Sequence, residues 1–355
     1  MTPRLELALL FGGRSGEHAV SLRSAASVSA ALRTRFDVHL VLIDRTGSWF
    51  LQPGPEPAAT GGVPVFVAAQ PADHGCLRRT RDASVAANPA VYFPLVHGTY
   101  GEDGTLQGLL ELAAVPYVGA GVAASAAAMD KELMKALFAQ AGVPQVPYRT
   151  LRAGRPPETA ALVAGLGLPL FVKPANLGSS VAVSKVKREA ELAGALAAAF
   201  AYDTKVLVEA AVDAREIEVS VIGNREPEAS LPGEIVPDRE FYDYDSKYSA
   251  TSQTRLLIPA PLTRPEVATL RALAVQAFRA VDACGYGRVD FFIDRASGRL
   301  LVNELNTIPG FTSISMFPKL WEASGLSYPD LLARLVDLAL DRHAERARLR
   351  TDYGA

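Results

Sequence analysis

Short apolar runs alternate with segments of helical periodicity along the first part of the chain. The runs Leu5–Phe11, Val38–Ile43 and Val91–Val96 have the length and the mainly apolar character of buried parallel strands. Apolar residues recur at helical spacing in Glu17–Arg33 and Thr105–Ala113. Strands that alternate with helices predict an α/β layer structure, and we expect this first unit to span residues 1–120.

The pattern predicts two further units, over residues 121–212 and 213–355. In the first of them, a Gly-Ser loop joins two short apolar runs, and two helices flank them. In the second, a polar, tyrosine-rich stretch without periodicity, residues 240–254, predicts a loop between a strand and a long helix. The expected helices are Asp130–Ala141, Glu189–Ala201, Pro265–Val281 and Tyr328–His343, and the expected strands are Pro169–Lys173, Val181–Val186, Val206–Glu209, Glu216–Ile222, Arg288–Ile293 and Leu300–Leu305.

Composition narrows the class of protein. The 355 residues are 49% hydrophobic and 21% charged, which is typical of a folded chain of two or three domains. Lys plus Arg number 36 against 38 Asp plus Glu, so neither a nucleic-acid nor a membrane partner is expected. The uncharged stretch Leu112–Met129 is mostly alanine and contains proline and glycine, so we do not interpret it as a membrane span. Without a signal-peptide pattern or a cysteine framework, we expect a cytoplasmic protein.

The predicted hairpin near the C-terminus gathers polar side chains on one face. If its turn is centred on Ser297, Asp290 faces Glu304 and Arg288 faces Asn306. Two carboxylates and an amide suit Mg²⁺ that holds nucleotide phosphates, and the arginine suits a developing negative charge. The alternative is a solvated strand face with an Arg–carboxylate pair, because a slip of one residue would change the pairing.

Two loops are candidate ligand contacts. Small residues in Lys173–Ser180 allow backbone amides to approach phosphate oxygens, and the lysine adds a charge. The loop is not a Walker A sequence, and a plain hairpin turn is the alternative. The segment Glu240–Tyr248 has three tyrosines and a lysine, which suit a lid that closes over a ligand, or else a packed surface loop.

The first unit has polar and glycine residues where its strands end. Gly12–Gly16 follows the first strand, and His97-Gly98 follows the third and precedes Gly101–Gly104. Ligands bind at the carboxyl ends of strands in open α/β sheets. The dinucleotide sequence G-x-G-x-x-G is absent, and a lone histidine is usually structural. Lys131, on sequence alone, is interpreted as a surface lysine.

Together these stretches resemble the D-alanine–D-alanine ligases of the ATP-grasp superfamily. The resemblance implies an N-terminal open parallel α/β domain followed by two ATP-grasp subdomains, with ATP between the second and third units. Each matching stretch is short, but they occur in the family's order over nearly the whole chain. They are Phe11–His18, His97–Gly104, Met129–Lys131, Lys173–Val181, Phe241–Tyr248, Gly287–Asp290 and Asn303–Thr312.

The resemblance also implies a reaction and roles for its residues. ATP would phosphorylate the carboxylate of one D-alanine, and the amine of a second would attack the acyl phosphate. Two Mg²⁺ or Mn²⁺ ions would be held by Asp290, Glu304 and Asn306. ATP would be bound by Lys131, Lys173, Ser180, Glu209, Val212, Glu216 and Lys247. Relatives are activated by K⁺ and form homodimers through the N-terminal domain.

The remaining roles concern the amino-acid substrates. Arg288 and the backbone N–H of Gly310 would form an oxyanion hole, and Ser315 would help Arg288 to hold the second carboxylate. Ser179 and Tyr248 would orient the first substrate, and His97 would lie near it. Glu17 is a further catalytic candidate. Because relatives that make D-alanyl-D-lactate lack the Lys247-Tyr248 pair, we expect an amine as the nucleophile.

Two positions depart from the family pattern. The first motif usually reads Glu-His-Glu-Val-Ser, but Ala19 stands in place of its second glutamate. That glutamate is expected to help bind the ammonium of the first D-alanine, so Ala19 favours an alternative: the same chemistry with another first amino acid, in antibiotic biosynthesis or self-resistance. Ala182 replaces the glycine that usually follows Gly-Ser-Ser-Val. A catalytically silent nucleotide-binding protein is a further alternative, which the intact metal and lysine set opposes.

Overall fold

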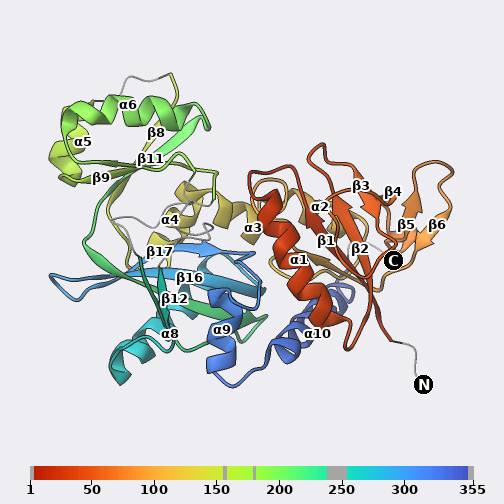
Figure 1. Cartoon of the computed structure of the whole chain (residues 1–355). Helices are drawn as coiled ribbons and strands as arrows, with labels where there is room; N and C mark the ends of the chain where they lie inside the picture. Colours follow the sequence, from red (N-terminus) through yellow and green to blue (C-terminus); the bar gives the residue numbers. More distant parts are fainter. Residues whose placement is uncertain (1–3, 155–157, 179–180, 238–253, 351–355) are drawn as a thin grey trace.

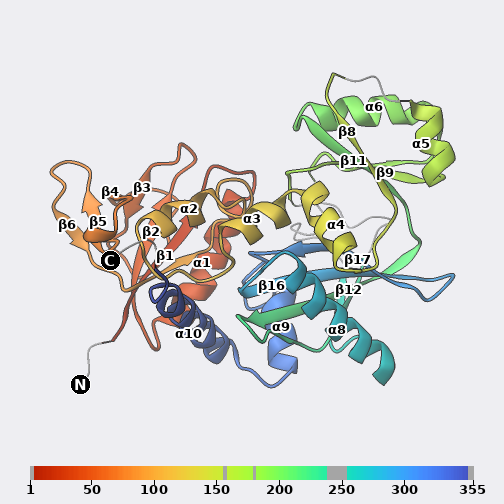
Figure 2. The ribbon, with the colours of Figure 1, turned by 180° about the vertical axis from the view of Figure 1, so that it is seen from behind.

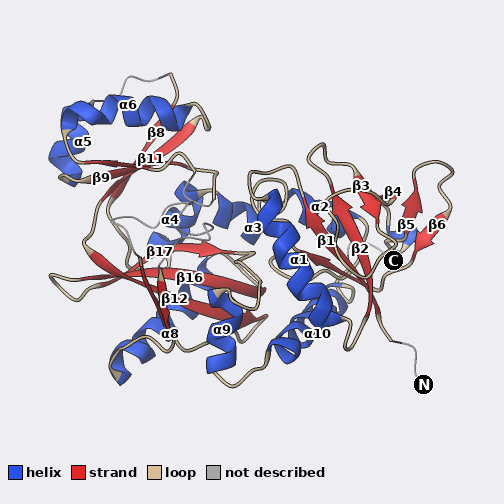
Figure 3. Ribbon diagram, viewed as in Figure 1, coloured by secondary structure: helices blue, strands red, loops and turns tan. Residues whose placement is uncertain are grey.

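The computed structural model of the chain describes residues 4–154, 158–178, 181–237 and 254–350. Their strands form three sheets, which succeed one another along the sequence (Figure 1). Helices pack against each sheet, as Figure 3 shows. Within this part of the chain, no helix combines the length and the apolar character needed to cross a membrane.

The first sheet is parallel at its centre, as predicted. Strand β1 pairs in parallel with β2 on one side and β7 on the other. Four shorter antiparallel strands extend the sheet in the order β6-β5-β4-β3-β2-β1-β7, and the sequence pattern did not predict them. The strands are β1 (Glu6–Gly12), β2 (Asp37–Ile43), β3 (Trp49–Leu51), β4 (Val63–Val67), β5 (Leu77–Arg79), β6 (Val85–Ala87) and β7 (Val91–Pro94), with the 3-10 turn η1 (Pro71–Asp73).

Strand β1 is apolar from Leu7 to Phe11 because both of its faces are covered. Leu7 and Leu9 lie in the core beneath α1 (His18–Leu32), whereas Ala8 and Leu10 lie in the core beneath α2 (Thr105–Leu112). Alternate residues of a strand point to opposite faces, so a sheet between two helix layers needs an unbroken apolar run. This arrangement leaves the carboxyl ends of the central strands as the place where polar residues gather.

The second sheet is antiparallel, in the order β10-β9-β11-β8. Leu170 and Val172 point into a core covered by α5 and α6. Their neighbours Phe171 and Lys173 therefore point to the opposite face, where α4 lies (Figure 2). The elements are β8 (Tyr148–Arg152), β9 (Leu170–Pro174), β10 (Ser184–Val186), β11 (Lys205–Ala210), α4 (Lys131–Gln140), α5 (Thr159–Leu166) and α6 (Glu189–Phe200).

The third sheet is also antiparallel, in the order β15-β14-β12-β16-β17, with β13 paired to β12. Ile217 and Val219 point into a core shared with α3, α4 and α8, and Ser220 on the other face bonds to a carbonyl of α9. The sequence pattern did not predict α9. The elements are β12 (Ala214–Gly223), β13 (Glu228–Ala229), β14 (Gly233–Val236), β15 (Arg255–Leu257), β16 (Gly285–Asp294), β17 (Leu300–Asn306), α3 (Val122–Met129), α8 (Arg264–Ala280), α9 (Met316–Ala323) and α10 (Tyr328–Arg346).

Helix α10 returns to the beginning of the chain. It packs against α1 and β7 of the first unit, as well as against α9, which precedes it in sequence (Figure 1). Arg342 donates from Nη2 to the Tyr117 carbonyl at 2.9 Å and from Nη1 to Cys284 Sγ at 2.8 Å, and the helix continues to Arg346.

Candidate active site

The hairpin of β16 and β17 places its polar residues as the sequence predicted. Asp290 lies opposite Glu304, and Arg288 lies opposite Asn306. Beyond Asp290 the register shifts, so that Phe291 pairs with Val302. A β-bulge therefore places one extra residue in β17 and brings the two carboxylates into register.

A third carboxylate, which the sequence reasoning missed, joins this row. Glu218 on β12 lies directly opposite Asp290. Directly opposed residues of antiparallel strands share a face, so Glu218, Asp290 and Glu304 form one row across three strands. The sequence feature that could have pointed to Glu218 is the alternation of Glu216 and Glu218 within one strand. No local pattern, however, gave the register between β12 and β16.

Arg288 is held between two of these carboxylates. Its Nε lies 2.6 Å from Asp290 Oδ1 and 3.1 Å from Glu218 Oε2, and its Nη2 donates to Asp290 Oδ2 at 2.7 Å. Burial opposes the charge of Arg288, but Asp290 and Glu218 outweigh it and raise the pKa of the guanidinium well above its usual range. The cation is therefore permanently charged and fixed in direction.

The donor types in this row fit a hard divalent cation. Glu304 and Asp290 provide carboxylate oxygens, and the Asn306 amide lies beside them with its Nδ2 3.0 Å from Asp290 Oδ2. Among the residues that the structure describes, no group of three or more His, Cys, Asp or Glu side chains is arranged to hold a metal. The candidate set is thus two carboxylates and an amide, with Asp290 also paired to Arg288.

Lysines from α4 and β9 face the carboxylates. Lys131 donates from Nζ to the Leu177 carbonyl at 2.6 Å, and so reaches the Gly-Ser loop. Burial lowers the pKa of Lys131, although Glu304 partly opposes this effect. The interpretation of Lys131 as a surface lysine, made from sequence alone, is therefore wrong.

A buried ion-pair cluster surrounds Glu209 at the end of β11. Its Oε2 lies 2.6 Å from Lys173 Nζ, and its Oε1 lies 3.1 Å from Lys135 Nζ. Burial acts to raise the pKa of Glu209, but the two ammonium groups outweigh it and lower that pKa to about 2. The sequence reasoning missed Lys135, although it lies one helical turn after Lys131 on the same face of α4.

The other predicted nucleotide contacts lie around Lys173. Burial opposes the charge of this lysine, but Glu209, then Glu304 and Glu216, outweigh it, so the pKa of Lys173 is raised. Glu216 is half-buried near the start of β12, and Val212 is half-buried in the segment between β11 and β12. The structure thus brings Lys131, Lys173, Glu209 and Glu216 into one electrostatic neighbourhood.

On the side of the first sheet, Glu17 lies where three predicted motifs meet. A Cβ atom added to Gly98 would lie 2.8 Å from Glu17 Oε2, and one added to Gly178 would lie 3.1 Å from it. The carboxylate of Glu17 therefore contacts both the His97-Gly98 turn and the Gly-Ser loop. Ala19, in contrast, is exposed on the outer side of α1. Glu17 therefore provides a carboxylate beside both loops, and the effect of Ala19 on the first subsite stays a prediction.

His97 is buried and fixed as a neutral ring. Its Nδ1 donates to the Ile308 carbonyl at 2.9 Å, so Nε2 is left to accept from Ser24 Oγ at 3.1 Å. Burial lowers the pKa of His97, with Glu17 as a weaker opposing influence. The ring therefore joins the segment after β7 to the segment after β17.

Glu102 is a further group whose role the sequence reasoning did not assign. Its Oε2 accepts from the Gly98 N–H at 2.9 Å. Burial, and then the charge of Glu17, raise the pKa of Glu102 well above its usual range. A carboxyl group whose pKa is raised by burial and by a second carboxyl group nearby is a typical feature of functional sites.

Gly310 and Ser315 lie side by side after β17. A Cβ atom on Gly310 would lie 3.2 Å from Ser315 Oγ, so only a glycine leaves this space open. Ser315 precedes α9, and its Oγ accepts from the Thr312 N–H at 3.1 Å. Four predicted site residues lie outside the described residues, so their roles stay predictions: Ser179, Ser180, Lys247 and Tyr248.

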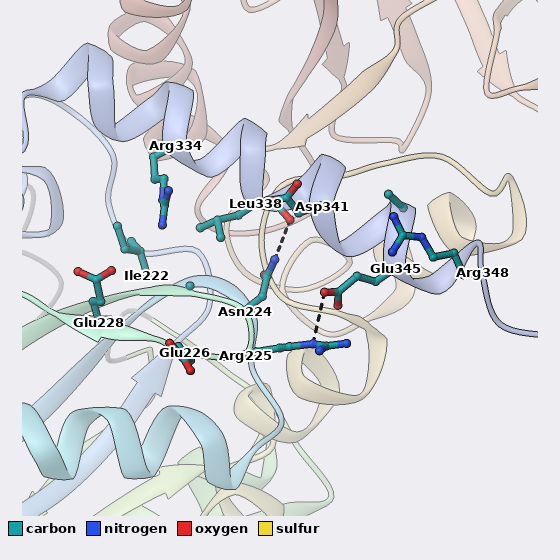
Figure 4. A pocket seen from close by; sticks show the side chains of 12 residues that line it. Ile222, Asn224, Arg225, Glu226, Glu228, Arg334, Leu338, Asp341, Glu345 and Arg348 are labelled. Atoms are coloured by element: carbon teal, nitrogen blue, oxygen red, sulfur yellow. Dashed lines mark hydrogen bonds and ion pairs between the residues drawn. The ribbon is translucent and has the colours of Figure 1, made fainter.

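A separate pocket lies between the β12–β13 turn and α10 (Figure 4). Asn224 donates to the Leu338 carbonyl at 2.9 Å across it, and Arg225 pairs with Glu345 at 3.3 Å. Its charges are of both signs, and none of the predicted site residues lines it. The candidate active site is therefore the junction described above and not this pocket.

Comparison with known sequences decides the family. The model described as "D-ala D-ala ligase N-terminus" matches residues 6–120, and "D-ala D-ala ligase C-terminus" matches residues 137–337. The chain belongs to the D-alanine–D-alanine ligase family. It therefore has the ATP-grasp fold that the motifs predicted, and the α/β fold class is confirmed.

Relatives match over nearly the full length. A D-alanine–D-alanine ligase of Heliobacterium modesticaldum is 50% identical, over 98% of this chain and 97% of the relative. The structure of the D-alanine–D-alanine ligase from Coxiella burnetii has a TM-score of 0.85 at 38% identity, covering 97% and 98% of the two chains. A D-Ala:D-Ser ligase from Enterococcus faecalis has a TM-score of 0.84 at 32% identity, covering 95% and 99%. Relatives with different named second amino acids thus share this fold.

Proposed function

We propose that this member of the D-alanine–D-alanine ligase family joins two D-alanine molecules with ATP, releasing ADP and phosphate, to supply peptidoglycan precursors. The observation that carries this proposal is the match to both halves of the family over nearly the whole chain. Arg288, which is held by the row of carboxylates, and the lysines Lys131 and Lys173 supply the positive charges that the reaction needs. The Glu17 carboxylate, which lies beside Gly98 and Gly178, supports D-alanine as the first amino acid.

Phosphoryl transfer depends on positioning and charge neutralisation more than on covalent help from the protein. Asp290, Glu304 and Asn306 would hold divalent cations, which we propose to be two Mg²⁺ or Mn²⁺ ions with K⁺ as an activator. When bound, these ions would neutralise phosphate oxygens. Lys131 and Lys173 bind the phosphates from the other side, and Glu209, Val212 and Glu216 bind the base and ribose. Ser180 and Lys247 complete the phosphate contacts.

The second step forms a tetrahedral intermediate with a negatively charged oxygen. Arg288 is fixed by two carboxylates and points its charge in one direction, so it stabilises this oxygen without reorganisation. The Gly310 N–H donates the second hydrogen bond. Ser315 lies next to Gly310 and, together with Arg288, binds the carboxylate of the second D-alanine.

The first D-alanine binds on the side of the first sheet. Glu17 binds its ammonium group, Ser179 and Tyr248 orient it, and the neutral His97 lies beside it. The lid that contains Lys247 and Tyr248 excludes water, because an acyl phosphate hydrolyses readily. An amine is the expected nucleophile because the chain has the Lys247-Tyr248 pair that D-alanyl-D-lactate-forming relatives lack.

The test is ADP release by the full-length chain with ATP, Mg²⁺ and D-alanine as the only amino acid, with the product identified by mass. We expect alanyl-alanine and one ADP per peptide. Glu304→Gln should abolish turnover, whereas the exposed Glu228→Gln, on β13 of the same sheet, should not. ATP binding without turnover on D-alanine would redirect the proposal to another amino acid.

The assembly and location are part of the proposal. We propose a cytoplasmic homodimer that associates through the first unit, on the basis of the family resemblance. The proposed domains, residues 1–120, 121–212 and 213–355, each contain one of the three sheets. Sedimentation of the full-length chain at micromolar concentration tests the dimer, and a monomer at that concentration contradicts it.

A further inference from the structure

The two oxygens of Glu209 are held by two lysines that differ in exposure. Lys135 Nζ lies 3.1 Å from Oε1, and the Lys135 side chain is only 1% exposed. Lys173 Nζ lies 2.6 Å from Oε2, and its side chain is 13% exposed. The carboxylate therefore lies between one cation that is fully enclosed and another that remains accessible.

Lys135 has a fixed position and a single ionic partner. Asp130 caps α4 by accepting from two backbone N–H groups, and Gln145 donates to the Lys135 carbonyl at 2.7 Å. Within the described residues, the Lys135 ammonium has Glu209 as its only recorded ion pair and no other hydrogen-bond acceptor. A buried ammonium is costly without a counter-charge, so this lysine and Glu209 depend on each other.

Lys173, in contrast, has several anionic neighbours. Glu304 and Glu216 act on it as well as Glu209, and it directly precedes the Gly-Ser loop. In the proposed reaction it also contacts the phosphates of ATP. A polyphosphate therefore competes with Glu209 for Lys173. Lys135 is enclosed, so its ammonium group cannot move to the phosphates and stays paired with Glu209.

We propose that Lys135 is a positioning residue for the nucleotide base. It keeps Glu209 ionised and oriented when Lys173 turns to the phosphates of ATP. Oε2 of Glu209 can then accept a hydrogen bond from the 6-amino group of adenine. This inference rests on the proposed function, which places adenine at Glu209. An ionised carboxylate only accepts hydrogen bonds, so it favours a 6-amino base over a 6-oxo base.

The test compares ATP with inosine triphosphate, whose base carries a 6-oxo group in place of the amino group. Each is titrated into the full-length chain with Mg²⁺ by calorimetry between pH 5.5 and 8.5. In Lys135→Met we expect the ATP-over-ITP affinity ratio to fall by about tenfold to a hundredfold, the loss typical for a hydrogen bond to a charged group. Lys135→Arg keeps the charge and should restore most of the ratio.

The pH dependence separates positioning from simple damage. Without Lys135, Glu209 loses a counter-charge and burial raises its pKa, so acid protonates it and ATP affinity falls as the pH falls. The wild-type ratio should be independent of pH over the same range. A Lys135→Met variant with the wild-type ratio and no pH dependence would overturn the proposal.

Two further variants guard against misfolding. Lys135→Met combined with Glu209→Gln removes both charges, so it should regain thermal stability but not the preference for ATP. The matched control is Arg78→Met, because Arg78 pairs with the buried Asp73 in the first sheet, at 2.7 Å from Nε to Oδ1. The Arg78→Met variant should have a lower Tm but the same ATP-over-ITP affinity ratio as the wild type. A lower ratio in Arg78→Met would also overturn the proposal.

Nucleotide binding is measured without turnover. A failure of the proposed ligase function can therefore be distinguished from a failure of the proposed role of Lys135. A wild-type chain that prefers ATP to ITP but does not ligate D-alanine contradicts the proposed function and leaves this inference supported. A wild-type chain that ligates D-alanine with ATP and ITP bound equally contradicts this inference alone.

Discussion

The Nε atom of Arg288 lies 3.1 Å from Oε2 of Glu218, a residue on the neighbouring strand β12. Asp290 binds the same guanidinium from its own strand. If Asp290 is drawn to a metal during the reaction, Glu218 is the carboxylate that keeps Arg288 in place. Glu218 is therefore expected to matter for catalysis although it was not recognised in the sequence.

The first prediction is that Glu218→Gln lowers kcat by about tenfold, the change that corresponds to 1.4 kcal/mol of transition-state stabilisation. The KM for ATP should stay within about twofold, because Glu218 lies on the side of Arg288 and not of the lysines. Steady-state ADP release measures both. Asp337→Asn, on the last helix, is the control, and an unchanged kcat in Glu218→Gln contradicts the role.

The second prediction separates Glu17 from Ala19. Glu17→Gln should raise the KM of the first D-alanine by about tenfold to a hundredfold, because a hydrogen bond to a charged group contributes about 1.5–3 kcal/mol. Ala19→Glu adds a carboxylate on the exposed side of α1 and should leave that KM unchanged. A lower KM in Ala19→Glu would show that the missing glutamate limits the first subsite.

The third prediction concerns Ala182, which has a φ of 55°. A left-handed backbone costs an L-residue about 1–2 kcal/mol, which explains why the family usually has glycine here. Ala182→Gly should therefore raise the free energy of unfolding by about 0.5–1 kcal/mol, once the greater entropy of the unfolded glycine chain is subtracted.

Urea denaturation measures this change. Ala193→Gly is the matched control, because Ala193 is exposed in the middle of α6, where glycine should lower the stability by about 1 kcal/mol. Opposite signs at the two positions are expected. A loss of stability at both would show that the loop conformation does not strain Ala182.

The fourth prediction concerns acid stability. The pKa of Glu209 is about 2 in the folded chain and about 4.3 in an unfolded one, so its contribution is present above about pH 5 and is lost as the pH falls toward 2. That contribution is on the order of 3 kcal/mol. Glu209→Gln should show a flatter decline of Tm between pH 5 and 2 than the wild type. Parallel declines would contradict this linkage.

The sequence predicted the elements and contacts that local patterns determine. The pairing of Asp290 with Glu304 was predicted correctly, but it depends on the β-bulge in β17, because the register next to the turn would place Asp290 opposite Asn303. The parallel strands of the first sheet followed from short, mainly apolar runs. Strands β3, β5 and β6 are only three residues long, which is too short for any periodicity to show.

The contacts that were missed depend on register between distant segments. Glu218 meets Arg288 only because β12 pairs with β16. Lys135 meets Glu209 only because α4, whose apolar residues pack in the core of the third sheet, also lies beside the second sheet (Figure 2). Neither relation leaves a local trace in the sequence. The sequence also did not show where the Glu17 side chain points, because the start of α1 decides whether Glu17 or residue 19 faces the site.

The return of α10 to the first sheet has a mechanical consequence. Buried residues of the first sheet, the third sheet and α10 form one continuous apolar core, in which the Phe311 ring packs against Phe93 and Tyr286. The second sheet has a core of its own. We therefore expect the first and third sheets to act as one rigid body. The second sheet should move relative to them, and this motion would open and close the site for ATP entry and ADP release.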